Sequence, residues 1–240
     1  MARIIAAFIC ASLLIAQMQT GVMAAHSTCY EIEQIHRSYG LMQIYFDSNS
    51  LRIDWHGAHL SIFSKAPDWR VNVINYATKK QASATFSDWC RSGFGTYLPW
   101  VEPKNLAGHY QKKIPIVFDG FKAYKLVCAE TREMVDDRKD GISWSTKRKN
   151  VPITMRYAFL DGIKIDSHIP RIVEAIYCVG WENRLILAIK GQYDGGVERP
   201  TLNTNSIKAV PSQKVRFEPP SDFQTVAMGQ ISQGKLDFFK

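Results

Sequence analysis

Residues 40–89 decide the fold of this chain, and they read GLMQIYFDSNSLRIDWHGAHLSIFSKAPDWRVNVINYATKKQASATFSDW. Four short segments of this stretch are rich in β-branched and aromatic residues: 41–46, 51–55, 60–63 and 70–76. In the second of them, LRIDW, large apolar residues alternate with charged ones, which is typical of a strand with one buried and one solvated face. Turn-forming residues separate the segments, and such short connections predict antiparallel neighbours in one sheet.

The first of these segments, LMQIYF, is apolar on both faces apart from Gln43. A strand of this kind is covered on both sides, or it lines a cavity with one face. Residues 82–89 are expected to form another strand or the entry to a loop, and Asp119-Gly120 is a strong hairpin signal. Further strands are predicted at 114–118, 121–128, 141–146, 151–159, 184–189 and 205–210.

Two helices are predicted. The clearer one covers residues 170–177, where Pro170 suits a first helical turn and the apolar side chains share one face. The shorter one covers residues 30–39, in which two isoleucines lie three positions apart. We therefore expect a single, mainly β domain over residues 26–240. Its strongly curved antiparallel sheet is expected to form an unclosed half β-barrel with a helix packed on the concave side.

The first 25 residues have the pattern of a signal peptide. Arg3 is positive, residues 4–16 form an apolar run too short for a comfortable membrane span, and small residues precede a cleavage position near Ala24 or Ala25. We therefore expect an exported protein, located in the periplasm or outside the cell. The remainder is long enough for one large β domain with a substantial core.

The cysteines fit an exported protein. Of the five in the chain, Cys10 lies in the apolar run, which leaves four disulfide candidates: Cys29, Cys90, Cys128 and Cys178. Four cysteines allow three pairings, and the sequence does not choose among them. No CxxC pair is present, so zinc is not expected. The remaining alternative is that some of these cysteines are small buried apolar residues.

Charge and motifs exclude several classes of function. The net charge of +8 is dispersed, and its densest cluster, at residues 147–149, indicates a solvated hairpin end rather than a nucleic-acid site. His56 and His59 lie at a strand junction without further ligands, so we expect no metal. No nucleotide-binding or hydrolase motif is present, so we expect neither a cofactor nor catalysis.

The order of these elements resembles a known family. A signal peptide and a short helix precede the strands at 44–46, 51–55 and 60–63, then VNVINYATK at 71–79 leads from a strand into a turn, and VRFEPPSDF at 215–223 follows near the end. This pattern is similar to the periplasmic lipoprotein-carrier superfamily of LolA/LppX-like unclosed β-barrels and their uncharacterised relatives. The chain departs from the carrier itself in its four cysteines and its longer middle section.

The resemblance implies a bent sheet that half-closes over internal helices and holds acyl chains on its concave apolar surface. It therefore implies a non-catalytic carrier or sensor, whose partner is a lipid or an acylated protein, with an anionic envelope surface as a peripheral contact. In the carrier an arginine on a strand holds the helical lid; Arg52 is the nearest candidate here, but the local match does not carry that role over. The expected ligand-binding residues on the concave face are Ile44, Phe46, Trp55, Phe63 and Ile176. The alternative is a cell-envelope or extracellular protein-interaction module with a filled interior and no small ligand.

Overall fold

The structure is a computed structural model that describes residues 28–92, 110–140, 143–177, 179, 182–193 and 196–231. Side chains are described for all of these residues except 132–150 and 193. The predicted signal peptide and Cys178 lie outside the described residues.

In the described residues, twelve strands form one sheet in the order β12-β6-β5-β4-β3-β2-β1-β11-β10-β9-β8-β7. Every neighbouring pair is antiparallel except β12 with β6, and β12 and β7 are the two edges of the unclosed sheet. The predicted mainly β, curved and unclosed sheet is therefore confirmed. The strands are β1 (Cys29–His36), β2 (Gly40–Phe46), β3 (Ser50–Trp55), β4 (Leu60–Lys65), β5 (Val71–Asn75), β6 (Lys80–Ala84), β7 (Tyr110–Phe118), β8 (Phe121–Asp140), β9 (Ser143–Leu160), β10 (Ile186–Tyr193), β11 (Arg199–Val210) and β12 (Gln224–Thr225).

The described helices are short. Two are α-helices, α2 (Phe86–Arg91) and α3 (His168–Tyr177), and three are single 3₁₀ turns, η2 (His56–Ala58), η4 (Ser212–Lys214) and η5 (Met228–Gln230). The end of the stretch 82–89 is thus helical rather than extended. Thr85 caps α2, because its hydroxyl accepts the backbone N–H of Asp88 at 3.1 Å. None of the helices in the described part of the chain has the length and apolar character that a membrane crossing needs.

The predicted helix over residues 30–39 is wrong, because this segment is strand β1. It pairs with β2 on one side and with β11 on the other. Ile32 is fully buried whereas Ile35 is 47% exposed, so the two isoleucines point to opposite faces of the sheet. Pairing with β11, far along the chain, outweighs a weak local pattern of two apolar residues.

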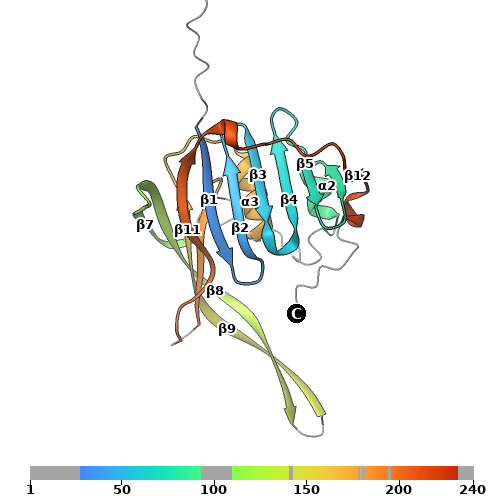
Figure 1. Cartoon of the computed structure of the whole chain (residues 1–240). Coiled ribbons are helices and arrows are strands. Elements are labelled where there is room, and N and C mark those ends of the chain that lie inside the picture. The colour runs from blue at the N-terminus through green and yellow to red at the C-terminus, as the bar shows by residue number, and fades with distance from the viewer. Residues whose placement is uncertain are drawn as a thin grey trace, which may run out of the picture.

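The hairpin of β8 and β9 is much longer than the sequence predicts. The strands expected at 141–146 and 151–159 belong to one strand, β9, which pairs with β8 from Ala123↔Leu160 to Asp140↔Ser143. The pairing of β7 with β8 reaches only Cys128, and that of β10 with β9 begins only at Ile153. Beyond these points β8 and β9 form a two-stranded ribbon that projects away from the body of the sheet (Figure 1).

Helix α3 lies against the concave face of the sheet, as predicted. In Figure 1 it is seen behind β2 and β3, and it also contacts β10. Apart from its first residue and Arg171, every residue of α3 is buried. A surface helix normally buries only one stripe, so α3 is an internal helix enclosed by the curved sheet.

A segment that we call the strap, residues 211–231, crosses the outer face of the sheet from the end of β11 to the edge at β6 (Figure 1). Its last turn, η5, lies past this edge, where Met228 and Ile231 join the inner core. The strap covers side chains that point away from α3, such as Phe63, which is only 2% exposed. An ion pair between Lys65 and Glu218 at 2.6 Å and the β12–β6 pairing hold the strap on the sheet. Three side chains of the sheet also donate hydrogen bonds to strap carbonyls: Arg52 Nη1 to Arg216 at 3.3 Å, Gln81 Nε2 to Phe223 at 3.0 Å and Asn75 Nδ2 to Ile231 at 3.1 Å.

Candidate functional site

Four of the five predicted ligand-binding residues lie together in the concave interior. Ile44, Phe46 and Trp55 point inward from β2 and β3, and Ile176 belongs to α3. Each of the four is at most 4% exposed and is part of the same hydrophobic core. With α3 in place, these side chains pack against protein.

The fifth residue, Phe63, is a correction to the prediction. In the pairing register Phe63 lies opposite Arg52, which in turn lies opposite Tyr45. Side chains that are directly opposite in a sheet share a face, so Phe63 lies on the outer face beneath the strap. Arg52 is on that face too, on the other side of the sheet from α3, so it is not placed to hold this helix.

The C-terminal end of α3 is tied to the sheet by buried hydrogen bonds. The Tyr177 hydroxyl donates to Gln34 Oε1 at 2.7 Å, and Gln34 Nε2 donates to the Ile186 carbonyl at 2.7 Å and to Thr204 at 3.0 Å. Thr204 in turn donates to the Leu187 carbonyl at 2.6 Å. The Ile186 and Leu187 carbonyls lie where the pairing of β10 with β9 shifts register, so this network satisfies backbone groups where the sheet is irregular.

The N-terminal end of α3 is held by a cap and by ring contacts. Asp166 Oδ1 accepts the backbone N–H of His168 at 2.9 Å. This hydrogen bond keeps the pKa of the Asp166 carboxyl below its usual value. The His168 ring stacks on Trp69 with centroids 5.1 Å apart, and Arg171 lies 5.1 Å above the ring of Phe86 in α2.

Glu174 is a buried carboxyl group on α3 that faces residues 182–184. Its side chain is fully buried, and its Oε1 accepts the backbone N–H of Glu182 at 2.9 Å. Its Oε2 has no hydrogen-bond partner among the described residues. Burial raises the pKa of Glu174 to about 8, although the backbone N–H groups nearby act in the other direction. The concave interior therefore holds a group whose ionisation opposes the docking of α3.

His36 is a second buried titratable group beside α3. Its ring stacks on Tyr39 at 4.0 Å and on Tyr177 at 5.7 Å between centroids. Its Nδ1 accepts the backbone N–H of Ser38 at 3.2 Å, which suits the neutral ring. Burial lowers the pKa of His36 to about 4.

The disulfide prediction is wrong for the described cysteines. Cys29, Cys90 and Cys128 all have free thiols, and Cys178 lies outside the described residues. Cys29 and Cys128 are almost fully buried, and burial raises the pKa of all three thiols to about 11. They are packed as small apolar side chains, which is the alternative that the sequence left open.

The two turn histidines take structural positions. His56 Nε2 lies 2.9 Å from Gln43 Oε1 across the β2–β3 pair, and His59 adopts the left-handed conformation, with φ of 52°, where η2 ends. No group of three or more His, Cys, Asp or Glu side chains in the described part of the chain is arranged to hold a metal ion.

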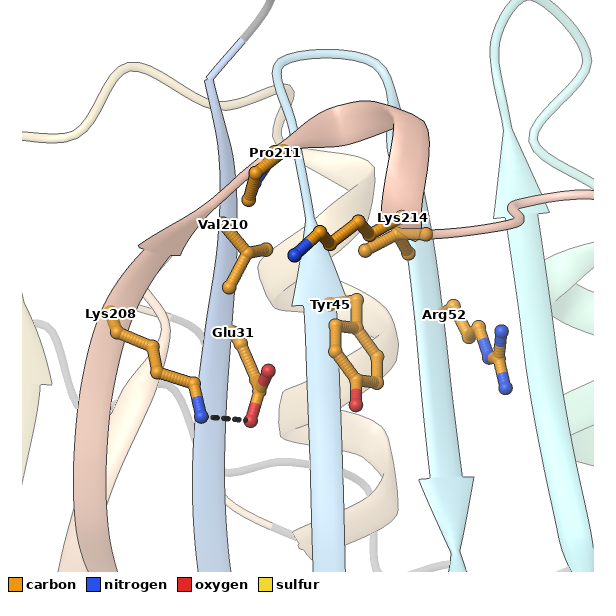
Figure 2. Close-up of a pocket in the computed structure, with 8 residues that line it drawn as sticks. Glu31, Tyr45, Arg52, Lys208, Val210, Pro211 and Lys214 are labelled. Atoms are coloured by element: carbon orange, nitrogen blue, oxygen red, sulfur yellow. Dashed lines mark ion pairs between the residues drawn. The ribbon is translucent and has the colours of Figure 1, made fainter.

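A second site, the strap pocket, lies on the outer face where the strap leaves β11. Its volume is about 400 Å³. The sheet contributes side chains from β1, β2, β3 and β11, and the strap forms the cover (Figure 2). The lining residues are Glu31, Tyr45, Arg52, Lys208, Val210, Pro211, Lys214 and Val215.

Ion pairs and contacts with aromatic rings hold the charged side chains Lys208 and Arg52 in the strap pocket. Lys208 Nζ is 2.8 Å from Glu31 Oε1, and this ion pair joins β11 to β1 (Figure 2). Arg52 is paired with Asp54 at 2.8 Å, and its guanidinium lies 5.6 Å from the ring centroids of both Tyr45 and Phe63.

Comparisons with known proteins do not assign the chain to a family. No protein-family model matches it, and no curated protein matches it either. Among solved structures, it is similar to an uncharacterised conserved protein from Thermus thermophilus, with 11% identity and a TM-score of 0.33. That likeness covers 89% of this chain and 98% of the other. It is too weak to carry any argument about function.

Sequence reasoning missed the strap pocket because no local motif marks it. Its residues come from the first three strands and from the region of residues 208–215, which lie far apart along the chain. The only early signal is Tyr45 in a strand that is apolar on both faces, since such a strand must be covered on its outer side as well.

Proposed function

We propose that the protein is an exported, non-catalytic binder of a lipid or acyl chain, and that α3 is the removable plug of its binding groove. The observation that carries this proposal is that eight of the ten residues of α3 are buried within an unclosed sheet. The wall beneath it consists of apolar side chains such as Ile44, Phe46 and Trp55. When α3 moves out, this wall is free to hold another apolar occupant.

The size of α3 supports an acyl chain as that occupant. A helix of ten residues is about 15 Å long and about 10 Å across. One acyl chain spans half of a hydrocarbon core of about 30 Å, which is also about 15 Å. The space that α3 fills is therefore long enough for one chain and wide enough for more than one.

The polar groups of α3 support its role as a plug rather than a permanent core element. Glu174 has its pKa raised to about 8 by burial, against an ordinary value of 4.5. At pH 7 this difference corresponds to about 3 kcal/mol that favours the release of the carboxyl group into water. Such a bias weakens the docking of α3 and makes exchange with a ligand easier.

Uptake of a fluorescent fatty acid, together with native mass spectrometry of protein purified from its own host, tests the proposal. We expect saturable uptake by the unaltered protein at pH 8. Glu174→Gln should take up the probe about a hundredfold more weakly, because the neutral amide no longer supplies the bias of about 3 kcal/mol that favours release of α3. Asp68→Asn, the same change of a carboxylate to an amide at an exposed position, is the matched control and should bind as the unaltered protein does. Absence of both probe uptake and co-purified lipid would refute the proposal.

A second candidate function, protein interaction, is favoured by the β8–β9 ribbon. An isolated two-stranded ribbon is only marginally stable in water, and within the described residues the outer edges of this one are unpaired beyond Cys128 and Ile153. A strand of another protein could add to such an edge. Replacing residues 131–152 with Asn-Gly should then abolish a cross-linked complex in the host while fatty-acid uptake stays intact. Retention of the complex would exclude the ribbon as the contact.

A further inference from the structure

We propose that the strap pocket binds a small organic oxyanion, a carboxylate or phosphate that carries a short aliphatic part. The pocket lies on the opposite face of the sheet from α3, so this site is separate from the groove proposed for an acyl chain. Its volume of about 400 Å³ falls within the range of small-molecule sites, about 300–1,000 Å³.

Positive charge dominates the lining of the strap pocket. Three cationic side chains, Arg52, Lys208 and Lys214, line it together with one carboxylate, Glu31. Lys208 neutralises Glu31 through their ion pair at 2.8 Å. Asp54, outside the lining, is paired with Arg52. The Lys214 ammonium is thus left as uncompensated charge, since it has no hydrogen-bond or ion-pair partner in the described part of the chain.

Two hydrogen-bond donors of the pocket are available to a ligand. Figure 2 shows the Lys214 side chain reaching from the strap toward the space between Val210 and Tyr45. The Tyr45 hydroxyl has no hydrogen-bond partner among the described residues either. Burial, with the nearby charge of Glu31, raises the pKa of Tyr45, so its hydroxyl stays protonated and donates. An ammonium and a phenolic O–H are donors suited to an oxyanion.

Arg52 adds a fixed positive field beside these donors. Its guanidinium is held by Asp54 and by the rings of Tyr45 and Phe63, and it donates to the Arg216 carbonyl of the strap at 3.3 Å. The arginine is therefore positioned before any ligand arrives, and little side-chain entropy is lost on binding.

The strap supplies the reason to expect an aliphatic part in the ligand. Val210, Pro211 and Val215 are the apolar side chains of the lining, and they lie where β11 passes into the strap. An inorganic anion would leave these side chains in contact with water, whereas a short alkyl group would bury them. The pocket thus combines a polar end with an apolar end, as ligand sites commonly do.

Isothermal titration calorimetry with three probes tests the proposal: butyl phosphate, butyrate and inorganic phosphate. We expect saturable binding of butyl phosphate or butyrate, with the better of the two identifying the oxyanion, and weaker binding of inorganic phosphate. Lys214→Ala should weaken binding by about tenfold, and Tyr45→Phe by a smaller factor, because charge-assisted hydrogen bonds are the stronger ones. Rising salt should weaken binding further.

Lys125→Ala is the matched control. Lys125 is exposed and lies on β8, and two strands, β9 and β10, separate β8 from β11 in the sheet. It removes the same charge and should leave affinity unchanged. Absence of saturable binding for all three probes overturns the proposal. So does an equal effect of Lys125→Ala and Lys214→Ala, which would indicate a non-specific charge effect. Inorganic phosphate binding as tightly as butyl phosphate would refute the aliphatic part. Fatty-acid uptake should be the same in all of these variants. A negative calorimetry result would therefore refute the strap-pocket proposal alone, and a negative uptake result would refute the proposed function alone.

Discussion

The Tyr177 hydroxyl donates to Gln34 Oε1 across 2.7 Å, and this bond joins the last residue of α3 to the first strand of the sheet. Both side chains are buried, and the same hydroxyl lies 3.4 Å from the Met42 sulfur. The amide N–H groups of Gln34 donate to the Ile186 carbonyl and to Thr204, and its side-chain carbonyl oxygen accepts the hydrogen bond from Tyr177. The position of α3 is therefore coupled to polar satisfaction inside the sheet.

Tyr177→Phe should destabilise the fold by about 1–3 kcal/mol, because it leaves the buried Gln34 oxygen without a donor. Urea denaturation followed by tryptophan fluorescence measures this loss. Tyr76→Phe is the control, since Tyr76 is 41% exposed and should change the free energy of unfolding little. If α3 is a plug, Tyr177→Phe should also speed fatty-acid uptake. Equal stability of the two variants would contradict the role given to the Tyr177–Gln34 bond.

Glu174→Gln should reduce the loss of unfolding free energy that the unaltered protein shows as pH rises from 4.5 to 8. The pKa of Glu174 is raised from 4.5 to about 8 in the folded protein, so its contribution is fully present below pH 4.5 and is lost as pH rises toward 8. At pH 7 the variant should be more stable than the unaltered protein by about 3 kcal/mol. Urea midpoints between pH 5 and 8 check this, and parallel curves for the two proteins would show that Glu174 is not the group responsible.

His36→Phe should reduce the loss of unfolding free energy that the unaltered protein shows as pH falls from 6.5 to 4. The pKa of His36 falls from 6.5 to about 4 on folding, so its contribution is complete above pH 6.5 and is lost as pH falls toward 4. At pH 5 this loss is about 2 kcal/mol in the unaltered protein. The variant keeps a ring against Tyr39 but has no proton to gain. Other carboxyl groups titrate in this range, so the difference between the two proteins is the quantity to measure. No difference in slope between pH 6.5 and 5 would exclude His36.

The sequence predicts the fold well where the evidence is local. The strands at 41–46, 51–55 and 60–63, the hairpin at Asp119-Gly120 and the helix at 170–177 all depend on periodicity or on turn residues within a few positions. The doubly apolar segment 41–46 is covered on its inner face by α3 and on its outer face partly by the strap, as such a pattern requires.

The errors arise where a distant partner decides the structure. Strand β1 exists because β11, some 170 positions along the chain, pairs with it. The face of Phe63 depends on the pairing of Trp55 with Leu60 across η2, and this pairing puts odd positions of β3 and even positions of β4 on the inner face. Hydrophobicity alone does not distinguish the two faces, since Phe63 and Ile62 are both buried.

Gly120→Ala should destabilise the β7–β8 hairpin by about 1 kcal/mol. Gly120 has φ of +81°, a left-handed conformation that alanine adopts poorly, and no atom lies within 4 Å of where its Cβ would be. The penalty is therefore conformational and not steric. Gly120→Asn should be milder, because asparagine tolerates this region better. Thermal unfolding of both variants checks the order, and an asparagine variant less stable than the alanine one would contradict it.

The cysteines give a prediction that separates disulfide bonding from simple burial. The thiols of Cys29, Cys90 and Cys128 are free, and burial raises the pKa of each to about 11. Only the thiolate reacts readily, so the folded protein should react slowly with Ellman's reagent at pH 8. In denaturant without a reductant, all three thiols should react at once. Single Cys→Ala variants should each remove one of these reactive thiols, which assigns the signal to its residue. A Cys→Ala variant that does not lower the number of reactive thiols in the denatured, unreduced protein would mean that this cysteine is bonded in solution.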